Sequence, residues 1–342
     1  MNSATYSATY SATYPATNNS KPKINFPKLE AIKKLKSSIS TRNRSTSDFI
    51  KPNGRSADFC LSIAYGCLLG CSYCYVQRHN LNGNPLTTYS NKDELFVAIL
   101  KHHNLLFTPK PPTFKPCDSN YPSGESDVIN YTYDVGESSD VLLRVISSDL
   151  NWWLTNLINV PYLKPTFATK ISTPVAISRL IDCPIPRKAR IRASVAPQNI
   201  IDQTEIMTAK VTDRIAGLNL AYEKGYECHL NFSPIIVTPT WVQDYSNLMI
   251  LLDELLSPKV KEQLHCEVIF LTHHTALSNW NAKNFPLDSE SLLWTPENQE
   301  FKTNGRGYDV KRYKWQLKSR YISTFKQLLS KYMPYCTIRY IF

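Results

Sequence analysis

The chain has 342 residues, enough for one large domain or two smaller ones, and 42% of them are hydrophobic, which can build a substantial core. Its apolar runs are too short to cross a bilayer and no secretory signal stands at its start, so a membrane or secreted protein is not expected. Nine scattered cysteines, an odd number, favour free thiols in a reducing, cytoplasmic compartment over a disulfide framework. The net charge of +11 is concentrated near the N-terminus, so it does not characterise the whole chain.

Residues 1–55 form a basic, low-complexity segment, which we predict to be disordered. They hold ten Lys or Arg and two acids, so they carry +8 of the net charge and leave +3 for the rest. Residues 3–14 repeat Ser-Ala-Thr-Tyr three times without an amphipathic period. Three interpretations stay open: a solvated tail, an arm that binds phosphates without sequence preference, and an organelle transit peptide.

A short strand is predicted at Phe59–Ala64, and a glycine-punctuated stretch, Gly-Cys-Leu-Leu-Gly-Cys-Ser-Tyr-Cys-Tyr, follows at 66–75. We call residues 66–75 the cysteine loop. Its three cysteines are spaced Cys-x3-Cys-x2-Cys, and thiolates this close can converge on one soft-metal centre. A cubane iron–sulfur cluster usually takes four thiolates, so three would leave one iron open to another ligand.

Two other metal sites stay open for the cysteine loop. A structural zinc site would need a fourth ligand, for which Cys60 and His79 are nearest, although the loop lacks the paired Cys-x2-Cys knuckles usual for zinc. A fully ligated cluster for electron transfer would take its fourth cysteine from elsewhere in the chain.

After the cysteine loop we expect a helix at 92–107 and a long polar loop at 108–130. Strands and helices then alternate, which predicts a parallel α/β architecture. The expected strands are Thr166–Thr169, Arg190–Val195, Cys228–Phe232 and Glu267–Thr272. The expected helices are Ser148–Ile158, Pro174–Ile181, Met207–Lys224, Thr240–Leu256 and Arg320–Tyr332, and a strand-like stretch, Cys336–Phe342, comes last.

Polar residues gather where the predicted strands end. The cysteine loop follows the first strand, Gly136–Asp140 stands before the first alternating helix, Thr169-Lys170 ends another strand, and Ser194 ends the next. In parallel α/β barrels the chemistry is carried at the carboxyl ends of the strands. The sequence therefore predicts that these residues belong to a single site.

The cysteine loop resembles the signature of the radical S-adenosylmethionine (radical SAM) superfamily, and its Cys-x-Tyr-Cys-Tyr form is closer still to the spore photoproduct lyase branch. Weaker similarities follow in order, at Tyr133–Asp140, Thr169-Lys170, Arg190–Val195, Asp213–Ile215, Ser233–Ile235, Trp241 and Lys314–Phe342. The resemblance implies a partial parallel (β/α)6 TIM-like barrel over residues 56–283, closed or flanked by a C-terminal extension at 284–342.

For that family, the resemblance implies a lyase with a [4Fe–4S] cluster that reductively cleaves S-adenosylmethionine to a 5′-deoxyadenosyl radical, which abstracts hydrogen from the substrate. An electron donor such as a flavodoxin or ferredoxin would supply the electron. In spore photoproduct lyase the substrate is a thymine dimer in DNA, so the resemblance makes DNA a candidate partner.

The resemblance also implies roles for individual residues. The cluster ligands would be Cys67, Cys71 and Cys74. Contacts with the adenine, ribose or carboxylate of S-adenosylmethionine would be made by Tyr73, Ser139, Lys170 and Ser194, and those residue types suit the task, because an ammonium pairs with a carboxylate and hydroxyls serve a ribose. Tyr75 would occupy the family's radical-relay position.

One position departs from the family. The DNA-repair members place a Cys in the second-strand segment as hydrogen donor, and the matching residue here is Glu137, whose carboxylate cannot donate a hydrogen atom as a thiol can. Gly136-Glu137 instead resembles a Gly-Glu element that holds an ammonium group, so Glu137 is predicted to bind the cofactor. Three alternatives therefore stay open: a thiol supplied by Cys117, a different substrate such as RNA, a peptide or a small metabolite, and a non-catalytic zinc-containing nucleic-acid-binding protein.

Overall fold

The computed structural model describes residues 39–53, 55–77, 86–106, 130–284, 287–303 and 307–342. The repeats at 3–14, nearly all of the polar loop predicted at 108–130, His79 and Cys117 lie outside these ranges.

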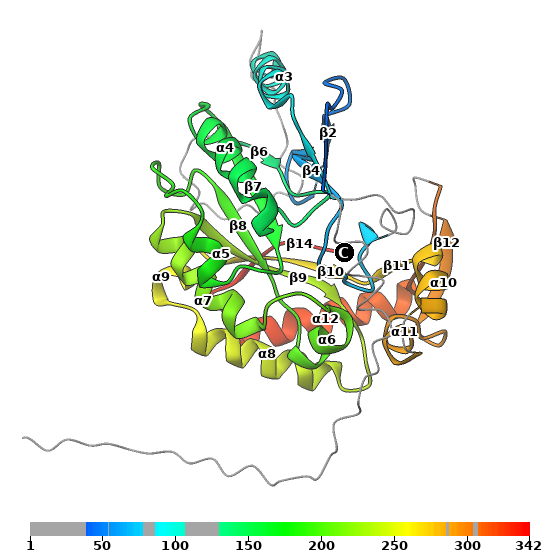
Figure 1. Ribbon diagram of the computed structural model, residues 1–342. Helices are drawn as coiled ribbons and strands as arrows, with labels where there is room; N and C mark the ends of the chain where they lie inside the picture. The colour runs from blue at the N-terminus through cyan, green and yellow to red at the C-terminus, as the bar shows by residue number, and fades with distance from the viewer. Residues whose placement is uncertain (1–38, 54, 78–85, 107–129, 285–286, 304–306) are drawn as a thin grey trace, which may run out of the picture.

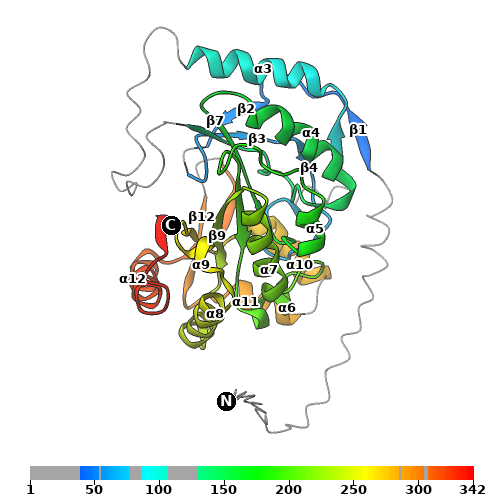
Figure 2. The ribbon, with the colours of Figure 1, turned by 90° about the vertical axis from the view of Figure 1, so that its left-hand side faces the viewer.

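A curled eight-stranded sheet forms the centre of the molecule (Figures 1 and 2). Its order is β14-β10-β9-β8-β7-β6-β3-β2, and all neighbours from β14 to β3 are parallel, whereas β2 is antiparallel to β3. The strands are β2 (Ile50–Pro52), β3 (Phe59–Leu61), β6 (Tyr131–Asp134), β7 (Leu163–Thr169), β8 (Arg190–Ser194), β9 (Glu227–Ile235), β10 (His265–Phe270) and β14 (Thr337–Ile341). The six neighbours β3 to β10 confirm the predicted partial parallel barrel.

Helices cover the outer face of this sheet (Figures 1 and 2). They are α4 (Ser147–Ile158), preceded by the short η1 (Arg144–Ile146), α5 (Pro174–Ser178), α7 (Val211–Glu223), α8 (Trp241–Leu255), α9 (Pro258–Lys261) and α12 (Trp315–Tyr332). Helix α3 (Lys92–Leu105) lies beyond the β6 side of the sheet, and α6 (Gln198–Thr204) precedes α7.

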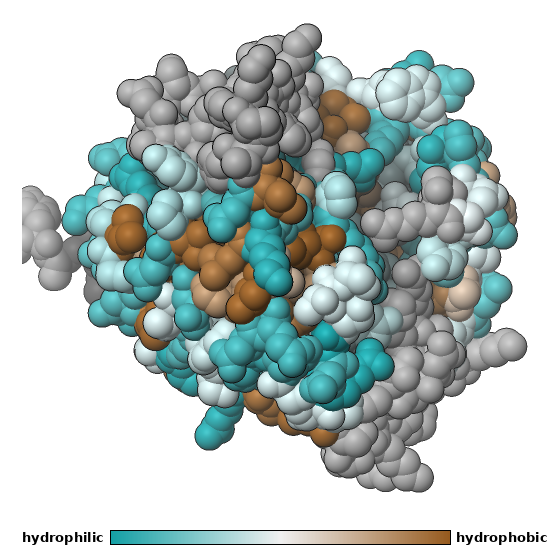
Figure 3. Space-filling view, turned by 90° about the horizontal axis from the view of Figure 1, so that it is seen from above, coloured by the Kyte–Doolittle hydropathy of each residue, from teal (hydrophilic) through white to brown (hydrophobic). Residues whose placement is uncertain are grey.

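Two small sheets flank the barrel. One joins β1 (Ser40–Arg42), β5 (Thr87–Tyr89) and β4 (Ala64–Tyr65). The other is antiparallel and joins β11 (Thr272–His274), β13 (Asp309–Tyr313) and β12 (Gln299–Thr303), next to α10 (Thr275–Asn284) and α11 (Leu287–Leu293). On the face seen from above, hydrophilic side chains surround several small apolar groups (Figure 3).

Strand β8 shows how the sheet can be buried on both faces and still carry polar groups. Because side chains alternate along a strand, Ile191 and Ala193 share the face toward α7, whereas Arg190, Arg192 and Ser194 share the interior face of the barrel. All five side chains are buried. The interior of the barrel is therefore polar, and its charges must be balanced from neighbouring strands.

Local sequence explains how the helices begin and how closely they pack. The Thr173 hydroxyl accepts the Ala176 N–H at 3.1 Å and Pro174 follows as the first helical residue, so α5 begins with a side-chain cap. In α7, a Cβ on Gly217 would lie only 1.8 Å from the Ser172 carbonyl oxygen. Glycine is thus required where α7 crosses the backbone that enters α5.

The structure corrects several predicted boundaries. The strand predicted at Phe59–Ala64 is two strands, because Ser62 bridges Gly136 and the chain then turns to pair β4 with β5. The strand predicted at Glu267–Thr272 ends at Phe270, and Thr272 already pairs with β13.

Ordered structure also begins before the boundary drawn at residue 55. Strands β1 and β2 lie within the predicted tail, and Phe49 is buried in the core, so disorder through residue 55 was wrong. Among the described residues, no helix is long and apolar enough to span a bilayer.

Candidate active site at the carboxyl ends of the strands

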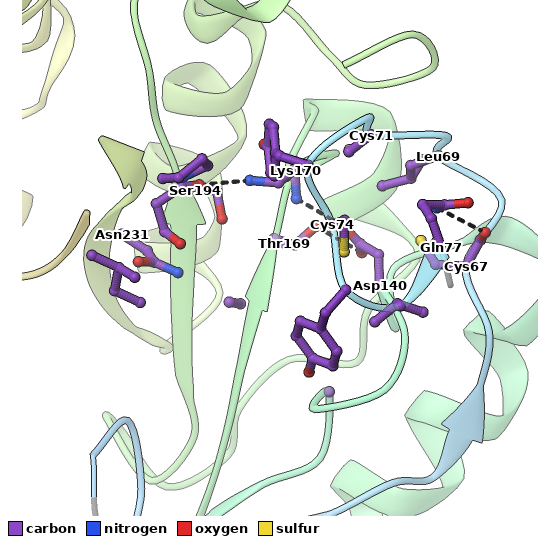
Figure 4. Close-up of a pocket in the computed structure, with 18 of the residues that line it drawn as sticks. Cys67, Leu69, Cys71, Cys74, Gln77, Asp140, Thr169, Lys170, Ser194 and Asn231 are labelled. Carbon is purple, nitrogen blue, oxygen red and sulfur yellow. Dashed lines mark hydrogen bonds between the residues drawn. The ribbon is translucent and has the colours of Figure 1, made fainter. Parts of the chain in front are cut away.

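A cavity of about 400 Å³ opens at the carboxyl ends of strands β6 to β10. One wall is the cysteine loop, and the facing wall carries Asp140 after β6, Lys170 after β7, Ser194 at the end of β8 and Asn231 in β9 (Figure 4). Its volume falls within the ~300–1,000 Å³ typical of small-molecule sites. The predicted convergence of strand-end residues is therefore present as a single cavity.

Glycines give the cysteine loop its course. Gly66 and Gly70 have positive φ angles of 87° and 68°, a region that L side chains rarely adopt. The Gly66 N–H donates to the Ser138 carbonyl at 3.0 Å, which ties the start of the loop to the segment after β6. The Gln77 side-chain amide donates to the Cys67 carbonyl at 3.3 Å, so a residue two positions past the end of the loop is bonded to its beginning.

The three loop thiols line the cavity and are largely shielded from solvent. Burial raises the pKa of Cys67 to about 12, with the negative charge of Asp140 as the next cause. Burial likewise raises the pKa of Cys71 and of Cys74. The thiols are therefore protonated at neutral pH, and because metals bind thiolates, loading with iron must release protons here.

The thiols do not form a ready-made site for a single ion. Within the part of the chain that the structure describes, no group of three or more His, Cys, Asp or Glu side chains converges for one metal ion. A zinc ion, with Zn–S bonds of about 2.3 Å, would need such convergence, whereas a cubane cluster spreads its irons and their thiolates over separate corners. Of the fourth ligands suggested for zinc, Cys60 does not line the cavity and His79 lies outside the described residues.

Lys170 carries the positive charge of the cavity wall. Its Nζ donates to the Ser233 carbonyl at 2.9 Å, lies 3.4 Å from a Glu205 carboxylate oxygen, and stands 5.5 Å from the centre of the Tyr73 ring. Asp140 fixes the backbone beneath it by accepting the Lys170 N–H at 2.8 Å. The ammonium is thus held at the cavity, where it can pair with an anionic group of a ligand.

Two buried polar atoms on the cavity wall have no hydrogen-bond partner among the described residues. They are the hydroxyl oxygen of Ser139 and the side-chain carbonyl oxygen of Asn231, and both residues are more than nine-tenths buried. Buried polar groups are almost always satisfied in native proteins. Their position on the wall fits hydroxyl or amino groups of a bound ligand, as the ribose and adenine of S-adenosylmethionine would provide.

Tyr75 and Glu137 meet at the mouth of the cavity. The Tyr75 ring is 46% exposed, and its hydroxyl donates to the Glu137 backbone carbonyl. Burial, and then the negative charge of Glu137, raise the pKa of the Cys60 thiol to about 12. Cys60 is buried and does not line the cavity.

All nine predicted site residues line this one cavity: Cys67, Cys71, Tyr73, Cys74, Tyr75, Glu137, Ser139, Lys170 and Ser194. The sequence analysis missed Asn231, although a signal exists, because polar and apolar residues alternate along the buried strand that contains it. It also missed Glu205, whose carboxylate contacts Lys170 and Tyr73 from the connection between α6 and α7. No local pattern marks Glu205. The roles of all these residues stay predictions.

Comparisons with known proteins agree with this architecture. The family model described as spore photoproduct lyase matches residues 127–342, well over half of the chain. The spore photoproduct lyase of Bacillus subtilis is 24% identical over 278 residues, which cover 81% of this chain and 73% of that protein. The spore photoproduct lyase of Clostridium acetobutylicum is 24% identical over 286 residues, covering 84% and 77%.

Solved structures show the same fold. A spore photoproduct lyase complexed with dinucleoside spore photoproduct superposes with a TM-score of 0.76 at 19% identity, covering 92% of this chain and 85% of that one. A double mutant of spore photoproduct lyase with bound AdoMet and dinucleoside spore photoproduct gives the same TM-score, identity and coverage.

Proposed function

Since this chain belongs to the spore photoproduct lyase family of radical SAM enzymes, we propose that it binds S-adenosylmethionine on a [4Fe–4S] cluster and acts as a lyase on a thymine dimer in DNA. The observation that carries the proposal is the single cavity that joins the cysteine loop to Lys170, Ser139 and Ser194. Ligand sites in parallel α/β folds lie at this end of the strands.

The residues present fit both groups. Three thiols within eight positions supply a soft ligand set for iron and leave a coordination position for another ligand. The Lys170 ammonium suits the carboxylate of S-adenosylmethionine, and the unpartnered oxygens of Ser139 and Asn231 suit its hydroxyl and amino groups. When bound, these groups supply the one-electron chemistry that abstracts hydrogen from a substrate.

The protein's own contribution is to bind, orient and exclude water. The hydrogen bonds of the cysteine loop fix the spacing of its thiols, and the apolar side chains of Leu69, Ile269 and Phe270 complete the cavity wall. Water kept away from the reacting atoms cannot quench reactive species. Tyr75 lines the cavity, is half exposed and donates to the Glu137 backbone carbonyl, which supports a role for it as the relay between the cavity and the substrate.

A second candidate function is supported by the thiols of the cavity. Among the described lining residues, the only cysteines are the three of the cysteine loop. The family resemblance of the sequence implies that Glu137 occupies the position of the donor Cys of the DNA-repair members. Cys117 lies outside the described residues. A substrate that needs no thiol donor, such as RNA, a peptide or a small metabolite, is therefore the alternative within the same enzyme class.

The proposal includes an electron donor of flavodoxin or ferredoxin type and a cytoplasmic location. None of the eight described cysteines is in a disulfide, which agrees with a reducing compartment. The same compartment would protect an oxygen-sensitive cluster.

Anaerobic reconstitution with iron and sulfide, followed by reduction in the presence of S-adenosylmethionine, tests the activity. We expect about four irons and four sulfides per chain and release of 5′-deoxyadenosine and methionine, with neither product formed by Cys71→Ala. Zinc without sulfide in the wild type, or full turnover by Cys71→Ala, would sink the proposal.

The substrate needs its own assay. Wild type and Glu137→Cys are compared on an oligonucleotide that carries a thymine dimer, with formation of thymine monomers as the readout. Monomers from wild type support the DNA substrate. Monomers from Glu137→Cys alone favour the second candidate, because they show that the cavity accepts the lesion but lacks a donor.

A further inference from the structure

Residues 204–209, from the last residue of α6 into its connection to α7, lie against several parts of the candidate site at once. Its backbone accepts the Ser72 N–H at 2.9 Å and donates to the Leu69 carbonyl at 3.1 Å, so it is bonded twice to the cysteine loop. It donates a third hydrogen bond, also 3.1 Å, to the Lys170 carbonyl. This segment therefore joins the two walls of the cavity.

Glu205 stands in the middle of that segment, with its side chain only 1% exposed. One carboxylate oxygen accepts the Tyr73 hydroxyl and lies 3.4 Å from the Lys170 Nζ. The other accepts the Thr208 hydroxyl at 3.0 Å and an Arg214 Nη at 2.5 Å. A single carboxylate thus contacts one predicted residue on each wall of the cavity.

Arg214, in α7, extends the connection to a third element. Its side chain is fully buried, and its second terminal nitrogen donates to the Ser194 carbonyl at 2.8 Å, while Nε donates to the Ala209 carbonyl at 2.9 Å. The planar guanidinium can hold these acceptors in one fixed arrangement, which a flexible lysine could not do. The Glu205–Arg214 pair therefore reaches the end of β8 as well as the cysteine loop and Lys170.

We infer that Glu205 and Arg214 are positioning residues, which hold the cysteine loop, Lys170 and the end of β8 in the arrangement that binds S-adenosylmethionine. The inference rests on the proposed function for its ligand. The Lys170 ammonium sits on a chain of four carbons and rotates freely unless its partners fix it. Glu205 supplies one of those partners and also fixes Tyr73, so its loss releases both sides of the cavity together.

A purely structural role is the competing explanation, because any buried ion pair that loses one partner destabilises a fold. Glu227 offers a matched control. It is also buried, and it pairs with Arg190 and Lys164. It precedes Asn231 by four residues of β9, roughly 13 Å along the strand, and it does not line the cavity.

The experiment compares Glu205→Gln with Glu227→Gln in the full chain, reconstituted anaerobically. Hydrogen–deuterium exchange measures the amides of the cysteine loop, and calorimetry measures the dissociation constant of S-adenosylmethionine. We expect faster exchange in the cysteine loop and about 10–100-fold weaker binding for Glu205→Gln, as for other supporting residues of metal sites. Glu227→Gln is expected to lower the melting temperature and leave both readouts near wild type.

A second variant keeps the inference testable if Glu205→Gln does not fold. Glu205→Gln/Arg214→Met buries no uncompensated charge at this pair, and such replacements are often tolerated in stability. A stable double variant that still shows the loosened loop and weakened binding supports positioning, whereas wild-type values in both readouts overturn it.

Each remaining outcome also supports or overturns one of the two proposals. Equal losses in Glu205→Gln and Glu227→Gln, or wild-type behaviour of Glu205→Gln, overturn the inference while the proposed function stands. Should wild type bind no S-adenosylmethionine, the proposed function fails, and the loop exchange still supports or overturns positioning by itself.

Discussion

The two ends of the barrel interior differ in the arrangement of their polar groups. Below the cavity, in what we call the ion-paired end of the interior, Arg192 pairs with Asp134 at 2.6 Å and with Glu267 at 2.9 Å, and all three side chains are buried. At the carboxyl ends of the strands, the cavity is lined by the three thiols of the cysteine loop and by the unpartnered oxygens of Ser139 and Asn231. Opposite charges hold neighbouring strands together below the cavity, whereas two unpartnered oxygens lie on the cavity wall, where a ligand can reach them.

Strand β8 contains the whole contrast within five residues. Arg190 and Arg192 point into the ion-paired end, and Ser194 on the same face lines the cavity. In the sequence these three residues cannot be told apart, because period-two alternation places all of them on one face of the strand. Their surroundings alone make two of them structural and the third a predicted binding residue.

The largest expected effect is on the ion-paired end. Replacing Arg192 by Met leaves the carboxylates of Asp134 and Glu267 buried without their shared partner, which should lower the free energy of unfolding by about 3–5 kcal/mol. Urea denaturation measures the change. Ser194→Ala, two residues further on the same face, should change stability by less than about 1 kcal/mol. Equal losses in the two variants would contradict the division.

Acid should weaken the pair that joins the two walls of the cavity. Burial opposes ionisation of Glu205, but the charges of Lys170 and Arg214 prevail and lower its pKa from 4.5 to about 2. The ionised carboxylate therefore stabilises the fold above pH ~4.5, and this contribution, roughly 3 kcal/mol, is lost as the pH falls toward 2. Urea unfolding between pH 2 and 6 should show a shallower pH dependence for Glu205→Gln than for wild type. An unchanged pH dependence in Glu205→Gln would show that ionisation of Glu205 does not stabilise the fold in this pH range.

Two lysines of β7 and its end should differ in their effect on binding. Lys170→Met removes the charge at the cavity, and we expect about 10–100-fold weaker binding of S-adenosylmethionine, since hydrogen bonds to charged groups contribute ~1.5–3 kcal/mol. The free energy of unfolding of Lys170→Met should change little, because Glu205 keeps its ion pair with Arg214. Lys164→Met, whose partner Glu227 likewise keeps Arg190, should leave binding of S-adenosylmethionine near wild type, because Lys164 does not line the cavity. Calorimetric titration and urea denaturation of both variants give the comparison, which fails if Lys164→Met weakens binding as much.

The smallest expected effect comes from comparing a hydroxyl that has no hydrogen-bond partner with one that has a partner. Ser139→Ala should weaken S-adenosylmethionine binding about 2–10-fold without loss of stability, since its hydroxyl has no partner among the described residues. Thr169→Val should instead destabilise the fold by ~1–3 kcal/mol, because the Thr169 hydroxyl donates to buried Asp140 at 2.9 Å. Loss of stability in Ser139→Ala would show that the oxygen has an internal role.

The sequence alone was enough for the barrel and for the outline of the site. Alternating strand and helix patterns, with strands expected at Arg190–Val195 and Cys228–Phe232, predicted the parallel sheet, in which these strands run from Arg190 to Ser194 and from Glu227 to Ile235. The spacing of the cysteine loop predicted thiols on one centre, and position at a strand end pointed to Lys170 and Ser194. These features are local, because each is set by residue order over a few positions.

Tertiary structure decided what depends on contacts between distant segments. The split of β3 from β4 follows from a bridge between Ser62 and Gly136, more than seventy positions apart. Glu205 matters because its carboxylate contacts Tyr73, Lys170 and Arg214, which belong to separate elements. Which polar residues of the barrel interior are neutralised and which are left for a ligand is likewise set across strands, so no window of sequence contains it.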